Sequence, residues 1–508
     1  MPAWKNRDIT IAEVELPGYA GSGDHLCLTI LYHPEIARVG EVAHLHGLDG
    51  GAELLLGRQQ LEFSAVRGES TGRPLLDPYI SRQPVIMQLR DGSLDLQLLD
   101  HRSSVSVNRH SIRDGHRIEQ AELRAGVVLV LARRIVLFLH YSHASPIADD
   151  LCGMIGESDS LQRVRQLITR VAPTDTTVLV LGESGTGKEL VARAIHQRSV
   201  RADKEMLSLN MAAIPAELAA AELFGVRRGA FTGADADKLG FFARADGTTL
   251  FLDEVGDSAN AIQSLLLRAL QEGEIQPAGG VVESVDVRAI AATDAGLESS
   301  DFSVALRHRL SGFEIHIAPL RERREDIGRL LAHLLADFMP VEADDNAVAV
   351  GQWAMLMQDF ACYDWPGNIR ELINFARQID IASTDSAGLV VPDNILLALH
   401  MEPRLNSQSK RKRRARDISD EEICETMLKA RHEISRSARA LEVSRQALYQ
   451  RIKSIPQIRI AANVPKTEVE TVYHDCNGEL DSAAALLQVS RSGLRRRWRA
   501  LELEPRES

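Results

Sequence analysis

The chain has little cysteine and no long uninterrupted apolar run, and both shortages exclude classes of protein. The odd number of cysteines, their scatter and the lack of metal-ligand spacing predict reduced thiols in the cytoplasm, not a disulfide framework. The most apolar stretch, residues 126–141, contains Arg133 and Arg134, so it predicts two core strands and not a membrane span. The first ten residues lack the charged-then-apolar pattern of a secretory signal. The five cysteines are at positions 27, 152, 362, 424 and 476.

Length and charge predict several domains, one of which meets nucleic acid. At 508 residues the chain is too long for a single core and should hold about three or four domains. The net charge of −12 is uneven, because residues 404–459 hold 15 Lys and Arg against 7 Asp and Glu. An acidic body with a basic tail is typical of a protein whose tail alone binds nucleic acid.

The texture of the sequence divides the chain. In residues 1–146 short β-type runs alternate with turns, which predicts an all-β sandwich. In residues 150–396 apolar strands alternate with helical patterns, which predicts an α/β domain with a parallel sheet. Within it, residues 326–339 and 367–381 are expected to form a helical lid. A polar basic linker, residues 397–417, then precedes an all-α tail.

The loop after the apolar strand 176–181 has the spacing of a phosphate-binding P-loop, and a helical pattern follows it. Glycines let backbone N–H groups point at phosphate oxygens, the helix N-terminus adds partial positive charge, and Lys188 reaches the terminal phosphates. A second apolar strand, residues 248–252, ends in Asp253 and Glu254, which fit a Mg²⁺ ligand and a base that polarises the attacking water. The predicted ATP-binding residues are Gly182, Glu183, Ser184, Gly185, Thr186, Gly187, Lys188 and Glu189.

Six motifs in one order closely resemble the AAA+ module of bacterial enhancer-binding proteins, the activators of RNA polymerase that carries sigma-54. Glu189, which stands in place of the usual Ser or Thr after the P-loop lysine, points to a subfamily of P-loop proteins. The resemblance spans about residues 155–396 and implies ATP hydrolysis with Mg²⁺ in a ring of subunits, typically a homo-hexamer. The motifs are GESGTGKE at 182–189, ELFG at 222–225, GAFTGA at 229–234, TLFLDEVG at 249–256, PLRERREDI at 319–327 and WPGNIREL at 365–372.

The resemblance assigns roles to further residues at matching positions. Asn210, in LSLNMAA, matches the asparagine that restrains the water-activating glutamate until the partner engages. Arg370 matches the lid arginine that contacts nucleotide. Arg309 matches an arginine finger offered to the neighbouring subunit, which stabilises transition-state charge only if subunits assemble.

Two positions depart from the family pattern. Asp294 stands where the first sensor is usually Asn, and Ser303 stands at the other finger position, with Arg307 close by. A carboxylate near the γ-phosphate repels it unless the carboxyl group is protonated or paired. These departures leave open a regulator with weak or no ATP hydrolysis, in which nucleotide controls assembly only.

The GAFTGA motif predicts a loop that contacts another protein. An exposed Phe231 beside Thr232 and small residues suits a surface that docks and withdraws. In the resembled family this loop touches sigma-54 and couples hydrolysis to remodelling, whereas a plain flexible connection is the alternative. The loop consists of Gly229, Ala230, Phe231, Thr232, Gly233 and Ala234.

The tail contains an internal repeat. Aligning residues 433–452 with residues 479–498 gives eight identical pairs in 20 positions. Each copy predicts a helix, a short helix, a turn and a final helix, and resembles the Fis-type helix-turn-helix module that ends most enhancer-binding proteins. The copies occupy residues 418–457 and 464–503. Arginine and glutamine in copy one fit base reading, whereas the arginines of copy two, with Gly493 weakening its final helix, fit phosphate clamping. A three-helix dimerisation unit is the alternative. The predicted DNA-binding residues are Ser444, Arg445, Gln446, Tyr449, Gln450, Lys453, Arg491, Arg495, Arg496 and Arg499.

The front domain resembles a forkhead-associated (FHA) domain at LLLGR, which ends in Arg58, and at ISR, which contains Ser81. Such domains bind phosphothreonine, with an arginine and a serine on the phosphate and an asparagine, here Asn108, on the peptide backbone. Pro84 replaces the family's histidine, which leaves open a scaffold used only for docking.

Together these features predict a cytoplasmic activator with no membrane partner. It binds double-stranded DNA at upstream enhancer sites, hydrolyses ATP with Mg²⁺, remodels the sigma-54 RNA polymerase holoenzyme, and answers to a phosphothreonine protein. A rival hypothesis is an AAA+ unfoldase or helicase-like motor, against which GAFTGA and the base-reading helices argue. The other is the DNA-binding regulator with weak or no hydrolysis.

Overall fold

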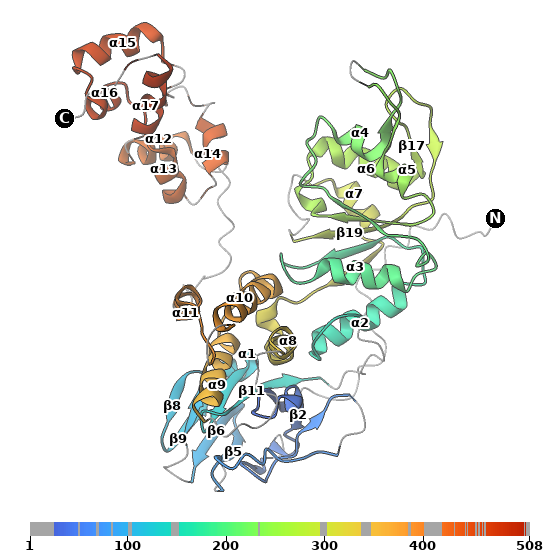
Figure 1. The fold of residues 1–508 in the computed structure, drawn as a ribbon, viewed down its shortest axis with the longest axis vertical. Helices are drawn as coiled ribbons and strands as arrows, with labels where there is room; N and C mark the ends of the chain where they lie inside the picture. Colours follow the sequence, from blue (N-terminus) through green and yellow to red (C-terminus); the bar gives the residue numbers. More distant parts are fainter. Residues whose placement is uncertain are drawn as a thin grey trace. The chain divides into compact units, whose positions relative to one another are not determined.

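The chain folds into two compact units, Met1–Glu402 and Pro403–Ser508. The first unit holds a β-sandwich, a parallel α/β core and a helical lid, and the second holds α12 to α17 (Figure 1). The structure, a computed structural model, describes residues 25–48, 51–67, 71–82, 85–99, 104–143, 152–231, 234–294, 302–336, 347–384, 388–400 and 419–503, the last range with short gaps at 431, 442, 444, 453–454, 456–457, 460, 462–463 and 502.

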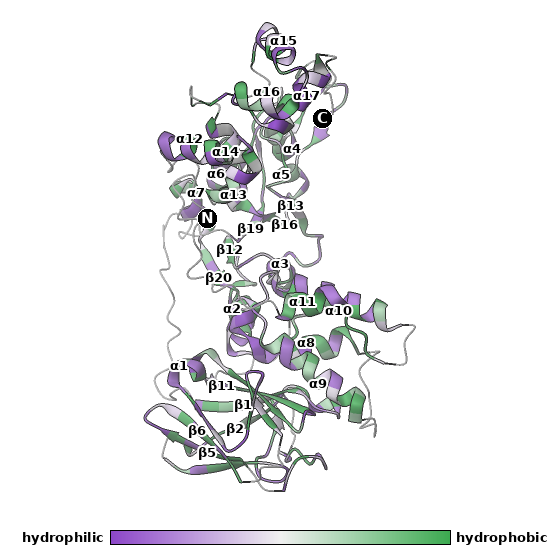
Figure 2. Cartoon of the chain, turned by 90° about the vertical axis from the view of Figure 1, so that its left-hand side faces the viewer, coloured by the Kyte–Doolittle hydropathy of each residue, from purple (hydrophilic) through white to green (hydrophobic). Residues whose placement is uncertain are grey.

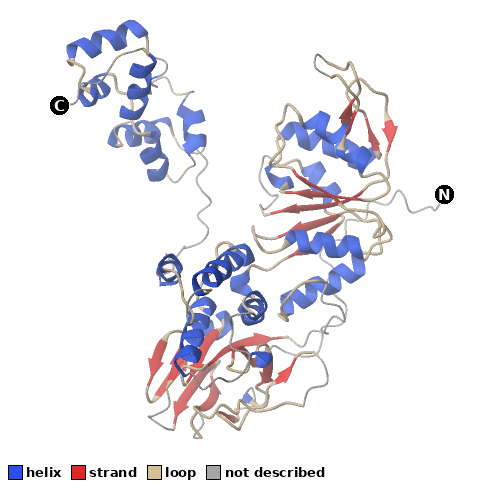
Figure 3. Cartoon of the chain, viewed as in Figure 1, coloured by secondary structure: helices blue, strands red, loops and turns tan. Residues whose placement is uncertain are grey.

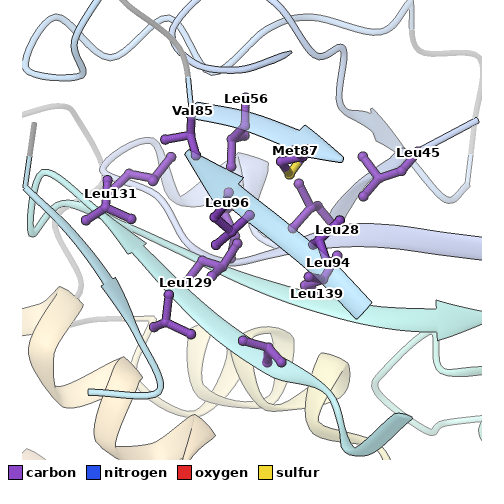
Figure 4. Close-up of a cluster of buried hydrophobic side chains, with 14 of the residues drawn as sticks. Leu28, Leu45, Leu56, Val85, Met87, Leu94, Leu96, Leu129, Leu131 and Leu139 are labelled. Atoms are coloured by element: carbon purple, nitrogen blue, oxygen red, sulfur yellow. The ribbon is translucent and has the colours of Figure 1, made fainter. Parts of the chain in front are cut away.

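The front domain consists of two facing antiparallel sheets, one in the order β4-β2-β1-β11-β10-β7-β8 and one in the order β3-β5-β6-β9. Apolar side chains such as Leu28, Met87, Leu94 and Leu139 fill the space between them (Figure 4). The β-rich prediction is confirmed, but the sequence did not predict helix α1. The elements are β1 (His25–Tyr32), β2 (Glu41–His44), β3 (Glu53–Leu56), β4 (Ser64–Ala65), β5 (Val85–Arg90), β6 (Ser93–Leu98), β7 (Val105–Val107), β8 (His110–Ile112), β9 (Gly115–Ile118), α1 (Gln120–Ala125), β10 (Val127–Leu131) and β11 (Ile135–Ser142).

The predicted parallel sheet is present, in the order β13-β16-β19-β12-β20, with helices on both faces (Figure 3). Val178 and Val180 point toward α2 and α3, while Leu179 and Leu252 point toward α4 to α7. Burial on both faces explains why these strands are apolar throughout. The elements are α2 (Asp159–Val171), β12 (Val178–Leu181), α3 (Lys188–Gln197), β13 (Leu207–Asn210), α4 (Ala219–Phe224), β14 (Gly225–Val226), β15 (Lys238–Leu239), α5 (Phe241–Arg244), β16 (Thr249–Asp253), α6 (Asn260–Glu272), β17 (Glu274–Ile275), β18 (Glu283–Ser284), β19 (Arg288–Thr293), α7 (Val304–Leu310) and β20 (Phe313–His316).

The described residues of the lid form four helices that share a hydrophobic core, and this core includes an aromatic cluster. The ring of Trp365 is fully buried and lies 5.2 Å from Phe360 and 5.1 Å from Tyr363 between centroids. Its indole N–H donates to the carbonyl oxygen of Phe360 at 2.9 Å. The described parts of the two predicted lid segments pack in one hydrophobic core, which includes Leu331 and Leu372, but the first helix ends at Leu334, before the predicted residue 339. Its helices are α8 (Ile327–Leu334), α9 (Ala347–Ala361), α10 (Asn368–Ser383) and α11 (Asp393–His400).

The outer face of the seven-stranded sheet packs against this lid. Leu31, Val128 and Phe138 share one hydrophobic core with Trp353 and Met357 of α9. Strands β10 and β11 are thus buried on both faces, which explains the continuous apolar run at residues 126–141. The sequence analysis did not predict this contact.

The second unit contains two similar groups of three helices. The predicted inward residues Leu448, Ile452, Leu494 and Trp498 are buried in the described structure, each within the core of its own group. Ser490 begins the last helix by accepting a hydrogen bond from the N–H of Gly493 at 3.1 Å. The helices are α12 (Asp420–Lys429), α13 (Ile434–Ala440), α14 (Arg445–Ile452), α15 (Lys466–Asp475), α16 (Leu480–Leu486) and α17 (Arg491–Ala500).

Candidate functional site

The P-loop joins β12 to α3 at the carboxyl end of the parallel sheet. Gly185 and Gly187 have left-handed φ values of 80° and 103°, which glycine adopts without steric cost. A side chain at Gly185 would collide with the carbonyl oxygen of Gly367 in the lid. Glycine is therefore required here both for the backbone conformation and for the close approach of the lid.

Lys188 begins α3 and folds back over the loop. Its ammonium donates to the carbonyl oxygens of Gly182 at 2.7 Å and Glu183 at 3.1 Å. Burial lowers the pKa of Lys188, whereas the negative charges of Asp294 and Asp253 act in the opposite direction. Asp294, which directly follows β19, therefore lies close enough to Lys188 to interact with its positive charge.

The two predicted carboxylates lie beside this lysine at the same sheet edge. Asp253 is the last residue of β16. Burial and the charge of Glu254 raise the pKa of Asp253, whereas the N–H of Glu254 and the charge of Lys188 act to lower it. Glu254 has a left-handed backbone, with φ 54°. Asn210 pairs with Asp253 across the parallel strands, and its amide donates to the Glu254 carboxylate at 3.0 Å. The structure thus brings together the carboxylate predicted to act as the base and the residue predicted to restrain it.

Two P-loop side chains have partners within the chain. The hydroxyl of Thr186 donates to the carbonyl oxygen of Glu183 at 2.8 Å. Glu189 is exposed and pairs with Arg193, one helical turn later, at 2.7 Å. The carboxylate that replaces the usual hydroxyl is therefore held on the helix surface by an arginine.

The lid closes over the P-loop through the predicted Arg370 and through Asn368 and Arg321, to which the sequence analysis gave no role. Asn368 is fully buried, and its amide N–H group donates to the carbonyl oxygen of Ser184 and to the carboxylate of Glu183, each at 3.1 Å. The predicted Arg370 donates to the Ser184 hydroxyl at 2.9 Å. Arg321 forms two hydrogen bonds with Glu183, at 2.6 and 2.8 Å, and these hydrogen bonds lower the pKa of that carboxyl.

Helix α7 carries the finger positions on another side of the core. Arg309 is exposed and its Nε donates to the carbonyl oxygen of Leu270 on α6 at 2.8 Å. Ser303 is the N-cap of α7, since its hydroxyl accepts from the N–H of Leu306 at 3.3 Å. A capping role gives a structural reason for serine at this position.

The GAFTGA loop extends from the core beside the β14–β15 ribbon. The N–H of Gly229 donates to the carbonyl oxygen of Ala234 at 2.9 Å, which closes the base of the loop. Phe231 is 55% exposed, and an exposed large apolar side chain fits a surface that contacts another protein. Thr232 and Gly233 lie outside the described residues.

In the sandwich, two predicted phosphate contacts belong to neighbouring loops. The carbonyl oxygen of Arg58 accepts from the N–H of Leu76 at 2.9 Å, at the start of the segment that leads to Ser81. A buried ion pair between Arg134 and Asp77, at 3.0 Å, fixes this segment against the β10–β11 turn. The structure therefore brings the Arg58 and Ser81 loops to one end of the sandwich.

Asn108 lies elsewhere, which corrects the prediction of a single three-residue site. Its side-chain oxygen accepts from the N–H of Val128 at 2.9 Å, so it holds the β7–β8 turn at the start of β10. The β10–β11 turn is at the opposite end of that strand. Arg109 in the same turn pairs with Asp359 of α9 at 2.8 Å. Asn108 therefore does not lie with the Arg58 and Ser81 loops.

The tail presents its predicted arginines on the last helix. Arg491, Arg495, Arg496 and Arg499 are exposed on α17 and line one surface hollow of about 510 Å³. Tyr449 is half-buried on α14. Ser444 and Lys453 lie outside the described residues, as do the side chains of Arg445, Gln446 and Gln450.

The strand, glycine loop and helix with Lys188, joined by the carboxylates of the adjacent strand and a helical lid, define a P-loop NTPase fold of the AAA+ class. Two family models match the same region: "Sigma-54 interaction domain" over residues 154–316 and "AAA+ ATPase lid domain" over residues 321–418. Within the described part of the chain, no helix has the length and apolar character needed to cross a bilayer.

Comparison with known proteins identifies the family. The transcriptional regulatory protein ZraR of Escherichia coli strain K12 is 41% identical over 302 residues, which are 58% of this chain and 67% of ZraR. The DNA-binding transcriptional regulator NtrC of Klebsiella pneumoniae is 44% identical over 246 residues, 47% of this chain and 51% of NtrC. The solved structure of NtrX from Brucella abortus in complex with ATP is 31% identical, with a TM-score of 0.42 over 60% of this chain and 69% of NtrX. The chain belongs to the family of sigma-54-dependent transcriptional regulators.

Proposed function

We propose that this protein activates transcription by hydrolysing ATP to remodel the closed promoter complex of sigma-54 RNA polymerase. The observation that carries the proposal is the convergence of Lys188, Asp253, Glu254 and Asn210 at one edge of the parallel sheet. Phosphate binding, a water-activating carboxylate and a restraint on that carboxylate are the groups that phosphoryl transfer to water requires.

The site residues fit Mg²⁺ and triphosphate. Asp253 is half-buried, and burial is the main cause that raises the pKa of its carboxyl group. The carboxylates of Asp253 and Glu254 at one sheet edge are oxygen ligands of the kind that Mg²⁺ binds. When bound, Mg²⁺ supplies charge neutralisation at the β- and γ-phosphates. Lys188 exchanges its loop carbonyls for phosphate oxygens, and Arg370 donates from the lid. Glu254 orients water once Asn210 releases it.

The proposal includes a ring, because an arginine finger stabilises transition-state charge at the nucleotide of a neighbouring subunit. Arg309 on exposed α7 is the candidate finger for the neighbouring subunit, and Arg307 lies on the same short helix. Assembly as a hexamer makes hydrolysis depend on protein concentration. In that ring the GAFTGA loops, with exposed Phe231, deliver the motion to sigma-54.

The remaining parts supply location and control. The exposed arginines of α17 bind DNA phosphates at upstream enhancer sites, and α14 reads bases. The sandwich takes a phosphothreonine segment at the Arg58 and Ser81 loops, without Asn108. Binding of double-stranded DNA raises the local concentration of the activator near its promoter.

One observation favours a second candidate, a DNA-binding regulator that hydrolyses ATP weakly or not at all. Asp294 adds a carboxylate to the field around Lys188, and Ser303 caps α7 where the family has a finger. Phosphate release by the purified full-length chain separates the two candidates. We expect turnover that rises with protein concentration and disappears in Glu254→Gln, which keeps binding ATP. Nucleotide-dependent assembly with phosphate release equal to that of Glu254→Gln would favour the second candidate.

A further inference from the structure

The sandwich contacts its two neighbours through interfaces of different chemistry. Toward the lid the contact is apolar: Leu31, Val128 and Phe138 enter the same core as Trp353 and Leu331. Figure 2 shows hydrophobic colouring along much of α9, which lies next to the sheet. Apolar interfaces of this kind resemble a domain core and separate rarely. The sandwich and the lid are therefore expected to move as one body.

Toward the α/β core the sandwich makes polar contacts. Arg67 pairs with Glu157, just before α2, at 2.9 Å. Asp159, the first residue of α2, accepts from the Ser142 hydroxyl at 3.1 Å and from the His143 N–H at 2.7 Å. Each contact joins the sandwich to the start of α2. We call these contacts the α2 latch.

Glu157 also bonds to the core and the lid. Its carboxylate lies 3.5 Å from Arg165 of α2 and 3.8 Å from Arg329 of α8, and it accepts from Gln162 at 2.6 Å. Its side chain is only 9% exposed, so these charges act with little solvent screening. The buried carboxylate of Glu157 thus lies close to arginine side chains of the sandwich, the core and the lid.

A cavity of about 540 Å³ lies beside the latch, which shows that this interface is not closely packed. Histidines of the sandwich, including His44 and His140, line one wall, and Asp159 and Glu325 line the other. Polar contacts beside a hollow can be exchanged for contacts with water, whereas the apolar side chains of the lid interface cannot. We therefore expect the latch, and not the lid interface, to open.

We propose that the sandwich travels with the lid, and that the α2 latch restrains the rotation of the lid against the core and so slows nucleotide turnover. The lid carries Asn368 and Arg370, which bond to the P-loop. Release and rebinding of nucleotide in AAA+ motors requires lid movement relative to the core. This inference rests on the proposed ATP hydrolysis. It adds the direction of control, which is inhibition by the latched sandwich.

The test compares Arg67→Ala with Arg73→Ala in the full-length chain. Arg73 is a matched control, because its pairs with Glu35 at 2.8 Å and Glu41 at 3.4 Å stay within the sandwich. We expect Arg67→Ala to raise phosphate release at least threefold, Arg67→Lys to remain near wild type, and Arg73→Ala to leave the rate unchanged. Equal or lower turnover in Arg67→Ala would overturn the inhibitory latch.

A second measurement does not depend on hydrolysis. Hydrogen exchange at the amides of residues 153–165 should accelerate at least fivefold in Arg67→Ala relative to Arg73→Ala, while β10 and α9 stay protected together. Exchange that accelerates at β10 and α9 as much as at α2 would show that sandwich and lid do not move as one body. If no variant releases phosphate but exchange behaves as expected, the proposed ATPase function fails and the latch geometry stands.

A reversible lock provides the opposite perturbation. Ser142→Cys combined with Asp159→Cys replaces a polar latch contact by a disulfide. Oxidation should lower phosphate release at least threefold, and reduction should restore it above the wild-type rate, because the reduced form lacks the Asp159 contacts. Turnover that is unaffected by a fully formed disulfide would contradict the proposal.

Discussion

Replacing Asn368 should loosen the lid from the P-loop, and the structure allows the size of the effect to be worked out. The side chain accepts from the N–H of Leu320 at 2.8 Å and donates to Ser184 and Glu183 at 3.1 Å. Each buried hydrogen bond contributes about 1 kcal/mol net, so the three account for about 3 kcal/mol. Asn368 also has φ 52°, a left-handed conformation that costs alanine about 1 kcal/mol more than glycine.

The assay is native-state hydrogen exchange at the amides of α10 in the full-length chain. Asn368→Ala should lower the free energy of local opening by about 4 kcal/mol, and Asn368→Gly by about 3 kcal/mol. The glycine variant is the control that separates the backbone contribution from the hydrogen bonds. An alanine variant within about 0.5 kcal/mol of wild type, or a glycine variant that opens more easily than alanine, would refute the reasoning.

Three further perturbations address coupling, chemistry and pH. Thr232→Ala should leave nucleotide binding intact and abolish open-complex formation, and unchanged transcription from this variant would reject the role of the loop. Asp294→Asn should raise phosphate release roughly tenfold by removing a carboxylate near the γ-phosphate, and slower release would show instead that Asp294 is needed to balance Lys188. Burial, and then the charge of Asp326, raises the pKa of Glu325 above its usual 4.5, so the folded chain binds this proton more tightly than the unfolded chain. The stability that this group contributes is thus present at low pH and is lost as the pH rises toward the raised pKa. Glu325→Gln should therefore flatten the fall of Tm between about pH 5 and pH 8. Parallel Tm profiles of the variant and the wild type would contradict this prediction.

The nucleotide core could be predicted because the residues that define it lie in short, contiguous sequence motifs. A glycine loop between a strand and a helix fixes Lys188, and a strand that ends in two carboxylates fixes Asp253 and Glu254 at the same edge. Asn210 was assigned by the family resemblance, and the structure places it on β13, next to β16, where its amide reaches Glu254. Local sequence therefore determines the positions of Lys188, Asp253 and Glu254, whereas the order of strands in the sheet decides the position of Asn210.

The lid contacts and the docking of the sandwich depend on tertiary packing between distant segments. Asn368 lies in the WPGNIREL motif, but the loop that it contacts is 184 residues away in sequence, so the motif alone does not show the contact. Burial of β10 on both faces did leave a signal, since the run at residues 126–131 is apolar at every position after Gly126. A run without alternation predicts a covered outer face, though not what covers it. The position of Asn108 relative to the Arg58 and Ser81 loops depends on how the strands of the two sheets are arranged, which local sequence does not show.

The destabilising effect of Gly493 on its helix can be predicted from the sequence, but the reason for a glycine at this position cannot. Glycine weakens a helix, yet a Cβ at this position would lie 2.7 Å from the Ser490 hydroxyl and 3.2 Å from the Cβ of Ala461. The segment between the two helical groups approaches α17 here, and only the folded chain shows it.

The central claim is that energy from ATP reaches sigma-54 through the GAFTGA loop. Full-length protein loaded with ADP and aluminium fluoride should capture purified sigma-54 on a gel-filtration column, whereas ADP alone should not. Protein that binds the transition-state mimic but never retains sigma-54, at concentrations where the ring is assembled, would contradict the account.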